Sequence, residues 1–186
     1  MIIYRFLFFV IPIILASQQE DYEYLYWSDT EKLECKDFQG PIDSARINDQ
    51  VVAFAASVFG TKYIQIDSSN DLACYKIMSV FKCHKSYMSK CKINLLTHEQ
   101  FHFNLYELYN RKLKEHLLKK LKCNEEINII KESELYSLKY DSVTYMYDLE
   151  TRHGDILIEQ KEWEERILQE LSDLSNYREV VICIPS

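Results

Sequence analysis

Hydrophobic residues recur at helical spacing in two stretches between residues 41 and 89. Pro41 is typical of a helix start and Gly60 of a helix end. The apolar face between them is formed by Ile42, Ala45, Val51, Val52, Ala55 and Phe59. A second helix is predicted from Asp71 to about Ser89, because its apolar stripe follows the helical period. That stripe consists of Cys74, Ile77, Met78 and Phe81. Apolar residues also cover its other faces, so residues 71–89 are expected to be the central element of the fold.

Two further helices are predicted after residue 96. Thr97 and Gln100 match the capping-box pattern at the start of a helix that extends to Lys122. Its buried stripe consists of Leu105, Leu108, Tyr109, Leu113, Leu117 and Leu121. The other helix, Ile156–Leu174, is amphipathic with an acidic outer face. Its inner residues are Trp163, Ile167, Leu171 and Leu174.

Residues 124–150 permit two interpretations. Their aromatic residues Tyr136, Tyr140 and Tyr147 lie at helical spacing, whereas the segment SVTYMY has the β-branched and aromatic composition of a strand. We predict a helix here. Two short runs, Thr61–Ile66 and the C-terminal REVVICIPS, are predicted to be extended. The whole pattern predicts a mainly α fold: a disulfide-linked helical domain of about four to five helices with minor short strands.

The first 17 residues have the pattern of a secretory signal peptide. Arg5 precedes the uncharged apolar run Phe6–Ala16, and an acidic segment begins at Gln18. A retained membrane anchor is the alternative, but the run is shorter than the roughly 20 residues that a membrane-spanning helix needs. We therefore predict an extracellular, secreted protein without a membrane span after cleavage. Its mature chain is expected to have an extended acidic, aromatic arm (residues 18–40) and a single domain (residues 41–186).

The net charge limits the classes of molecule that the chain is expected to bind. The chain carries a formal net charge of −7, which becomes −8 when Arg5 is lost with the signal peptide. A general nucleic-acid-binding protein is therefore excluded, because the chain as a whole does not attract phosphate. Lysine and arginine residues gather toward the end of the predicted Thr97–Lys122 helix, where they complement the negative end of the helix dipole. We interpret that cluster as a solvated surface.

Six cysteines follow the predicted cleavage site, and an even number in an exported chain implies three disulfides. They are Cys35, Cys74, Cys83, Cys91, Cys123 and Cys183. If residues 71–89 form one helix, Cys74 and Cys83 lie about 13 Å apart along its axis. A disulfide permits only about 7 Å between Cα atoms, so that pair is excluded, and Cys83 with Cys91 fails in the same way. The three central cysteines then pair with the other three in some order. An antiparallel helical hairpin favours Cys74–Cys123.

One motif carries chemistry: His98-Glu99-Gln100-Phe101-His102. It resembles the H-E-x-x-H signature of zincin metallopeptidases, in which two imidazoles four residues apart on a helix hold zinc and the glutamate is the general base. The resemblance implies that His98 and His102 are ligands and that Glu99 is the base. The third ligand is unassigned, and Glu125 or Glu126 are candidates by residue type. Two other interpretations of the motif are that it is the ordinary polar first turn of a capped helix, and that it binds metal only adventitiously.

The cysteine pattern carries a second resemblance. The cluster CYKIMSVFKCHKSYMSKC, followed by a lone downstream cysteine, loosely resembles secreted cysteine-rich helical domains of unknown function that are expanded in nematodes. That resemblance implies a disulfide-linked helical fold and no particular mechanism. The insect odorant-binding pattern is absent, because the closely spaced second and third cysteines of that class are missing.

Three functions are compatible with these features. The first hypothesis is a secreted, non-enzymatic binding module whose extracellular partner, a protein or a ligand, is unknown, and which needs no cofactor. The alternative is a zinc metallopeptidase that uses HEQFH. The third is a carrier of small apolar ligands in the helical core. A thiol enzyme is disfavoured because every cysteine is expected to be paired, and no G-x-S-x-G nucleophile motif is present.

Overall fold

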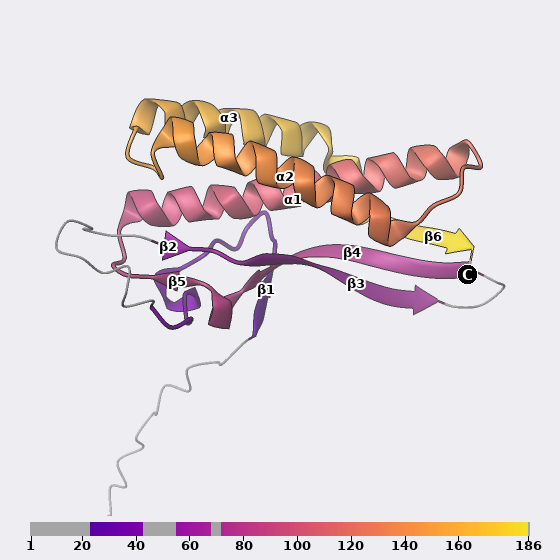
Figure 1. Cartoon of the computed structure of the whole chain (residues 1–186), viewed down its shortest axis with the longest axis horizontal. Coiled ribbons are helices and arrows are strands. Elements are labelled where there is room, and N and C mark those ends of the chain that lie inside the picture. Colours follow the sequence, from indigo (N-terminus) through magenta and orange to yellow (C-terminus); the bar gives the residue numbers. More distant parts are fainter. Residues whose placement is uncertain (1–22, 43–54, 68–71, 186) are drawn as a thin grey trace, which may run out of the picture.

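The computed structural model describes residues 23–42, 55–67 and 72–185, and Figure 1 shows their arrangement. Three α-helices lie over one face of an antiparallel sheet. They are α1 (Ile93–Lys122), α2 (Ile129–Thr151) and α3 (Leu157–Asp173). The mainly α prediction is therefore confirmed, but the described residues contain three α-helices instead of four to five.

The sheet is built around β4 (Leu72–Lys82). One edge of β4 pairs with β3 (Phe59–Asp67). The other edge pairs with β1 (Tyr24–Tyr26) at one end and with β6 (Val181–Pro185) at the other end. A separate two-stranded ladder joins β2 (Ala55–Ala56) to β5 (Tyr87–Met88). Single-turn 3-10 helices complete the described elements: η1 (Cys35–Asp37), η3 (Cys83–Lys85) and η4 (Ser175–Tyr177).

The prediction of a helix over residues 71–89 is wrong, because its described residues form β4, η3 and β5. Alternate β4 side chains face α1: Ile77 packs in the cluster of Leu113, and Phe81 packs against Phe103. Short apolar runs cannot be assigned by periodicity alone, and YKIMSVF has the aromatic and β-branched content of a strand. Partners on both edges of β4 satisfy its backbone groups: the preceding strand β3 on one edge, and β1 and β6 from distant parts of the chain on the other.

The central element is α1, which is covered on two sides. Toward the sheet, its residues Leu113 and Leu117 pack with Ile77 and Ile182. Toward the other two helices it contributes to a second core, formed by Phe101, Leu105, Leu108, Tyr140, Tyr147, Trp163, Ile167 and Leu171. A helix that is covered on both sides needs few solvated positions, which explains why many of its polar side chains are buried as well.

The remaining element predictions have mixed outcomes. The extended run Thr61–Ile66 lies within β3, and the helices predicted at 124–150 and 156–174 are confirmed as α2 and α3. The helix predicted from Pro41 to Gly60 is wrong at residues 55–60, which contain β2 and the start of β3, and its residues 43–54 lie outside the described part. The predicted signal peptide also lies outside it. The arm is joined to the sheet through β1, and its Cys35 is joined by the disulfide to Cys91 in the segment before α1. Within the described residues, no helix has both the length and the hydrophobicity that membrane crossing requires.

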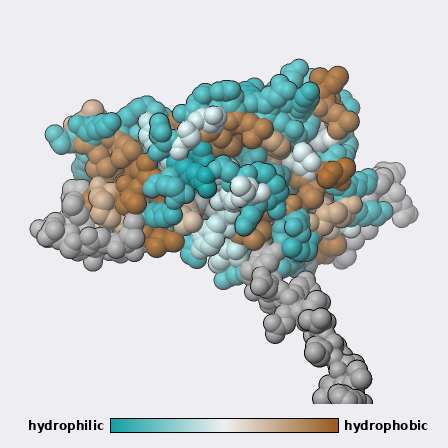
Figure 2. All heavy atoms as spheres, turned by 180° about the vertical axis from the view of Figure 1, so that it is seen from behind, coloured by the Kyte–Doolittle hydropathy of each residue, from teal (hydrophilic) through white to brown (hydrophobic). Residues whose placement is uncertain are grey.

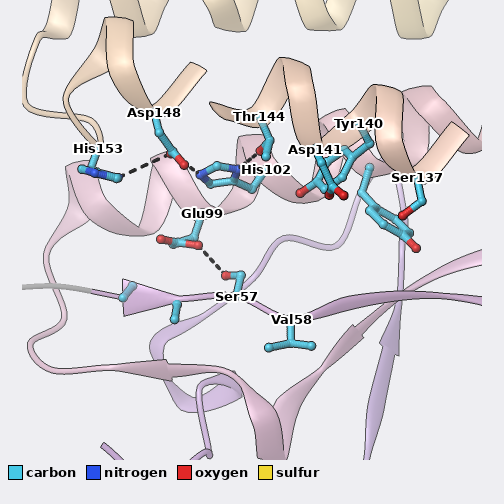
Figure 3. Close-up of a pocket in the computed structure, with 13 residues that line it drawn as sticks. Ser57, Val58, Glu99, His102, Ser137, Tyr140, Asp141, Thr144, Asp148 and His153 are labelled. Carbon is cyan, nitrogen blue, oxygen red and sulfur yellow. Dashed lines mark hydrogen bonds and ion pairs between the residues drawn. The ribbon is translucent and has the colours of Figure 1, made fainter. Parts of the chain in front are cut away.

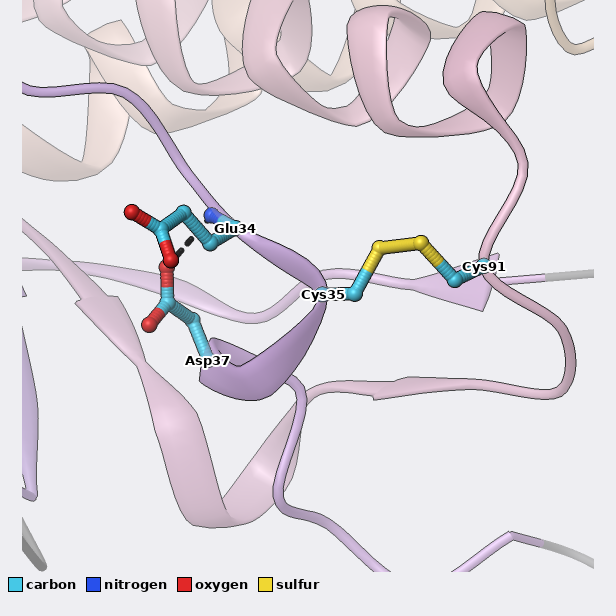
Figure 4. The surroundings of a disulfide bond; sticks show 4 residues. All are labelled: Glu34, Cys35, Asp37 and Cys91. Atoms are coloured by element: carbon cyan, nitrogen blue, oxygen red, sulfur yellow. Dashed lines mark hydrogen bonds between the residues drawn. A yellow bond between two sulfur atoms is a disulfide. The ribbon is translucent and has the colours of Figure 1, made fainter. Parts of the chain in front are cut away.

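Two disulfides join distant segments. Cys74 pairs with Cys183, directly across the β4–β6 ladder, and Cys35 in η1 pairs with Cys91, just before α1 (Figure 4). The Cys74–Cys123 prediction is therefore wrong, because it assumed a helix where β4 lies. The prediction of three disulfides is also wrong: Cys83 is a buried free thiol and Cys123 an exposed one.

The two free thiols cannot meet within one chain. Cys83 packs with Phe103 near the start of α1, whereas Cys123 follows the last residue of α1. Twenty helical residues, about 30 Å at 1.5 Å per residue, separate Phe103 from Cys123. A disulfide allows only about 7 Å between Cα atoms.

The free thiols are expected to differ sharply in reactivity. Burial, together with the charge of Asp37, raises the pKa of the Cys83 thiol to about 11, so that Cys83 stays protonated at about pH 8, where an ordinary thiol is partly thiolate. We expect a chromogenic disulfide reagent to titrate one thiol per native chain and two in concentrated guanidinium. Cys123→Ser should remove the native signal. Two rapidly reacting thiols in the native protein would contradict this assignment.

Candidate metal centre

The HEQFH residues lie inside α1, and the two histidines of the motif face α2. α1 begins at Ile93, so that the motif follows the first turn of the helix, and the predicted capping box is wrong. The Gln100 side chain instead accepts a hydrogen bond from the Leu33 amide and donates one to Asn104 Oδ1. His98 and His102 are one helical turn apart and point the same way, as residues at this spacing do. Both imidazoles are buried between α1 and α2.

Three side-chain atoms converge to form a small triangle. His98 Nε2 lies 2.9 Å from His102 Nε2. Asp148 Oδ1, from α2, lies 3.0 Å from His98 Nε2 and 2.8 Å from His102 Nε2. Figure 3 shows the Asp148 carboxylate directed at the His102 ring. Each of these three atom types is a common metal ligand.

The other nitrogen of each imidazole is held by a polar group. His98 Nδ1 lies 3.1 Å from Gln160 Oε1, a carbonyl oxygen that can only accept, so this nitrogen carries the proton. His102 Nδ1 lies 2.8 Å from Thr144 Oγ1. If both imidazoles carry their proton on Nδ1, as metal-binding neutral imidazoles would, both Nε2 atoms direct lone pairs into the triangle. Without a metal, protons on Nε2 make the hydrogen bonds to Asp148. Metal-binding histidines are oriented in this way by their outer partners.

Three acceptors this close together repel one another unless a proton or a cation lies between them. Burial alone would lower the pKa of His102, but the hydrogen bond to Asp148 and the charges of Glu99 and Asp148 outweigh it and raise that pKa above its usual range. Burial would likewise raise the pKa of Asp148, but the hydrogen bonds from His102 and His98 hold it well below its usual range. The site therefore favours positive charge at its centre.

The triangle fits a zinc ion closely in donor type and size. Ligand atoms about 2.0–2.1 Å from a tetrahedral zinc lie about 3.3 Å from one another, and the three edges here are 2.8–3.0 Å long. Outward shifts of a few tenths of an ångström would match the two. Two neutral imidazoles and one carboxylate are also the ligand chemistry of catalytic zinc sites, which leave a fourth position open.

Glu99 lies beside the triangle without being part of it. A carboxylate oxygen of Glu99 and one ring nitrogen each from His98 and His102 all lie within 4.8 Å of one another. Glu99 Oε2 also accepts a hydrogen bond from the Ser57 hydroxyl, from the segment after β2 (Figure 3). The Glu99 side chain is therefore held beside the two imidazoles by the Ser57 hydroxyl.

The turn after α2 closes one side of the site. Arg152, His153 and Gly154 have positive φ angles of 47°, 55° and 86°. Two consecutive non-glycine residues in this region are unusual, and such backbone strain tends to occur at functional sites. His153 Nδ1 lies 3.4 Å from Asp148 Oδ1, and its side chain is largely exposed. His98, Asp148 and His153 thus form a second possible ligand set.

Gly154 is expected to be required for this packing. A Cβ atom at position 154 would lie 3.0 Å from His98 Cβ and 3.2 Å from the Asn94 carbonyl oxygen, on a backbone with φ +86°. We expect Gly154→Ala to lower the free energy of unfolding by about 1–3 kcal/mol, as measured by urea denaturation. The matched control is Gly60→Ala, whose Cβ would meet the flexible end of Lys82. Equal effects of the two substitutions would contradict a special role for Gly154.

An open cleft of about 470 Å³ lies next to the triangle. Its walls come from α1, from α2, from the turn that contains His153, and from residues 55–58 (Figure 3). Glu99, His102 and Asp148 are all part of its lining. The candidate centre is therefore accessible to a molecule larger than water.

The structure brings together the residues of the motif but not the suggested third ligand. His98, Glu99 and His102 converge as their spacing predicts, whereas Glu125 and Glu126 are exposed beyond the far end of α1. About 30 Å of helix lies between His102 and that end. Asp148, Thr144, Gln160 and His153 were not found from the sequence. The available signal was the helical spacing of Thr144 and Asp148, which places both on one face of α2.

No protein-family model matches the chain, and neither the curated proteins nor the solved structures contain a significant match to it.

Proposed function

We propose that this protein is a zinc-dependent hydrolase of peptide bonds, with its active site at His98, Glu99, His102 and Asp148. The observation that carries the proposal is the triangle of three lone-pair donors, which opens onto a cleft beside an acidic side chain. Two further features are compatible with the zincin resemblance. The motif lies inside a long helix, and β-strands precede it.

Each residue has a defined task in this proposal. His98, His102 and Asp148 would hold the metal, and Gln160 and Thr144 orient the two imidazoles through their Nδ1 atoms. A bound zinc ion would polarise the substrate carbonyl and make the attacking water more acidic. Glu99 accepts the proton of that water and delivers it to the leaving nitrogen, so that the broken amide bond yields a carboxylate and an amine. Ser57 holds Glu99 in place through its hydroxyl.

The shape of the cleft favours an extended peptide as the substrate. Residues 55–58, which include β2, form one wall, and α2 forms the opposite wall. Extended peptides commonly bind beside strand segments, where backbone hydrogen bonds hold them and pockets receive alternate side chains. The two disulfides are compatible with an extracellular location.

Zinc stoichiometry tests the proposal. We expect one zinc per chain by elemental analysis of the protein secreted from an oxidising host, and loss of that zinc in His98→Ala. The control His84→Ala, at an exposed position in η3, should keep its zinc. The zinc-loaded protein should hydrolyse unstructured peptides, and a chelator should stop the reaction. A chain that takes up no zinc at micromolar free metal would refute the proposal.

A second candidate function is a non-enzymatic extracellular interaction module. It is favoured by exposed apolar side chains on one face of α2, at positions Leu138, Tyr145 and Leu149. Further apolar residues are exposed on α3, and hydrophobic patches alternate with hydrophilic ones on the face shown in Figure 2. Exposed patches of this kind often mark protein contacts. The apolar-ligand carrier is less favoured by the cleft, whose walls contain three carboxylates.

The two functions respond differently to substitution. If the protein is a binding module, Glu99→Gln should leave partner binding unchanged, and the double substitution Leu138→Ser with Leu149→Ser should weaken it. If the protein is a hydrolase, Glu99→Gln should abolish peptide hydrolysis, and the double substitution should leave it unchanged.

A further inference from the structure

We infer that the cleft selects peptides with a lysine or arginine beside the scissile bond, and that the Asp141 carboxylate binds that basic side chain. This inference rests on the proposed function and names the substrate class for the same site. The HEQFH motif does not predict this preference, because Asp141 lies on α2 and the motif lies on α1.

Asp141 belongs to a row of polar residues along α2. Ser137, Asp141, Thr144 and Asp148 follow one another at spacings of three or four residues, so they share one face of the helix. All four line the cleft, and Figure 3 shows them in order along α2. Thr144 and Asp148 belong to the metal centre. Asp141 therefore lies on the same wall of the cleft, about one helical turn beyond Thr144.

The charge of the cleft is unbalanced. Its described lining includes Glu99, Asp141 and Asp148 but no lysine or arginine, and His153 is exposed at its margin. Glu99 is engaged by Ser57, and Asp148 by the two imidazoles. Asp141 has no hydrogen-bond or ion-pair partner among the described residues and is exposed. The carboxylate is thus free to accept a charged group from a ligand, which strengthens a hydrogen bond about twofold over a neutral pair.

Aromatic rings lie next to this carboxylate. Tyr106 and Tyr140 line the same cleft, with ring centroids 5.0 Å apart in an edge-to-face arrangement. The Tyr106 hydroxyl is hydrogen-bonded to Thr61 Oγ1, which helps to hold its ring in place. The aliphatic stem of a lysine or arginine packs well on aromatic surface while its charged end reaches a polar partner. A glutamate side chain would instead face the three carboxylates.

The spacing suits a long side chain. Seven residues separate Asp141 from Asp148, which corresponds to about 10 Å along the helix axis. A lysine side chain reaches roughly 6 Å from its Cα atom. The distance from that Cα atom to the scissile carbonyl at the metal adds a few ångströms, so that the two together match the distance to Asp141. A short side chain would leave the Asp141 carboxylate out of reach.

The test compares peptides that differ at one position. Internally quenched peptides with lysine, norleucine or glutamate on one side of the scissile bond, and a second set varied on the other side, are given to the zinc-loaded protein. We expect kcat/KM for lysine to exceed that for norleucine by about tenfold in one of the sets, and glutamate to be the poorest. In Asp141→Asn the lysine-to-norleucine ratio should fall toward one, and Asp141→Lys should favour glutamate. The control Glu162→Gln removes an exposed charge on α3 and should keep the ratio.

A binding measurement separates this inference from the chemistry. Zinc-loaded Glu99→Gln should bind a fluorescent lysine peptide about tenfold more tightly than its norleucine counterpart, and adding Asp141→Asn should abolish the difference. Hydrolysis without a preference for lysine, or a preference that Asp141→Asn leaves intact, would overturn the inference while the proposed function stands. A protein that neither takes up zinc nor cleaves any of the peptides would overturn both.

Discussion

Glu99→Gln is expected to lower peptide hydrolysis by about 10²–10⁴-fold, the usual contribution of a general base, while one zinc per chain remains bound. Glutamine has the same shape and still offers an oxygen to the Ser57 hydroxyl, which donates a hydrogen bond to Glu99 Oε2 in the unsubstituted protein. It cannot take a proton from the attacking water. The loss should therefore appear in kcat, with little change in KM, because substrate contacts elsewhere in the cleft are kept.

The measurement is steady-state hydrolysis of a quenched peptide, with zinc content determined on the same sample. Glu134→Gln, at an exposed position on α2, is the matched control and should retain full activity. Activity of Glu99→Gln within threefold of the unsubstituted protein would show that another group is the base. Loss of zinc along with activity would show instead that Glu99 is a ligand, which its position near both imidazoles would allow.

Asp148→Asn is expected to weaken zinc binding by about a hundredfold or more. Loss of an outer hydrogen-bond partner of a ligand typically costs 10–100-fold in metal affinity, and Asp148 contacts both imidazoles directly at 2.8 and 3.0 Å. The amide keeps the size of the side chain but loses its charge. The remaining donors, two neutral imidazoles, would hold a divalent ion with no compensating charge in the triangle.

Competition with a chromogenic chelator measures the affinity, and circular dichroism shows whether the variant is folded. Asp155→Asn, a nearby exposed position in the turn after α2, should bind zinc as the unsubstituted protein does. Unchanged affinity in folded Asp148→Asn would reject Asp148 as a ligand. His153, which lies 3.4 Å from Asp148 Oδ1, would then be the residue to substitute next.

The cysteines show how one wrong element spreads through a prediction. Reading residues 71–89 as a helix placed Cys74 and Cys83 far apart and led to Cys74–Cys123. In the structure Cys74 lies on β4, directly opposite Cys183 on β6. The helical period does not apply to a strand, and the residue opposite Cys74 is set by the pairing of β4 with a distant segment. No local pattern of the chain contains that information.

The candidate site divides in the same way. The spacing of His98, Glu99 and His102 places them on adjacent positions of one helix wherever that helix lies, because a turn takes 3.6 residues. The partners of the two imidazoles come from 42 to 62 residues further along the chain, in α2 and α3. Glu99 is held by Ser57, which lies 42 residues earlier. Asp148 looks like any acidic residue on an amphipathic helix until α2 is packed against α1.

Local order was therefore determined by the sequence itself: the helices predicted at 97–122, 124–150 and 156–174, which the structure has at 93–122, 129–151 and 157–173, the extended run within β3, and the motif on α1. Their amphipathic period and residue composition act over a few neighbours, which is the range that a single sequence reveals. Only the tertiary structure decided that α1 is the central element, that β4 is a strand, which cysteines pair, and that Asp148 meets two imidazoles. Those outcomes depend on burial and pairing between segments far apart in the chain, where the competing local preferences are weaker than the gain from packing.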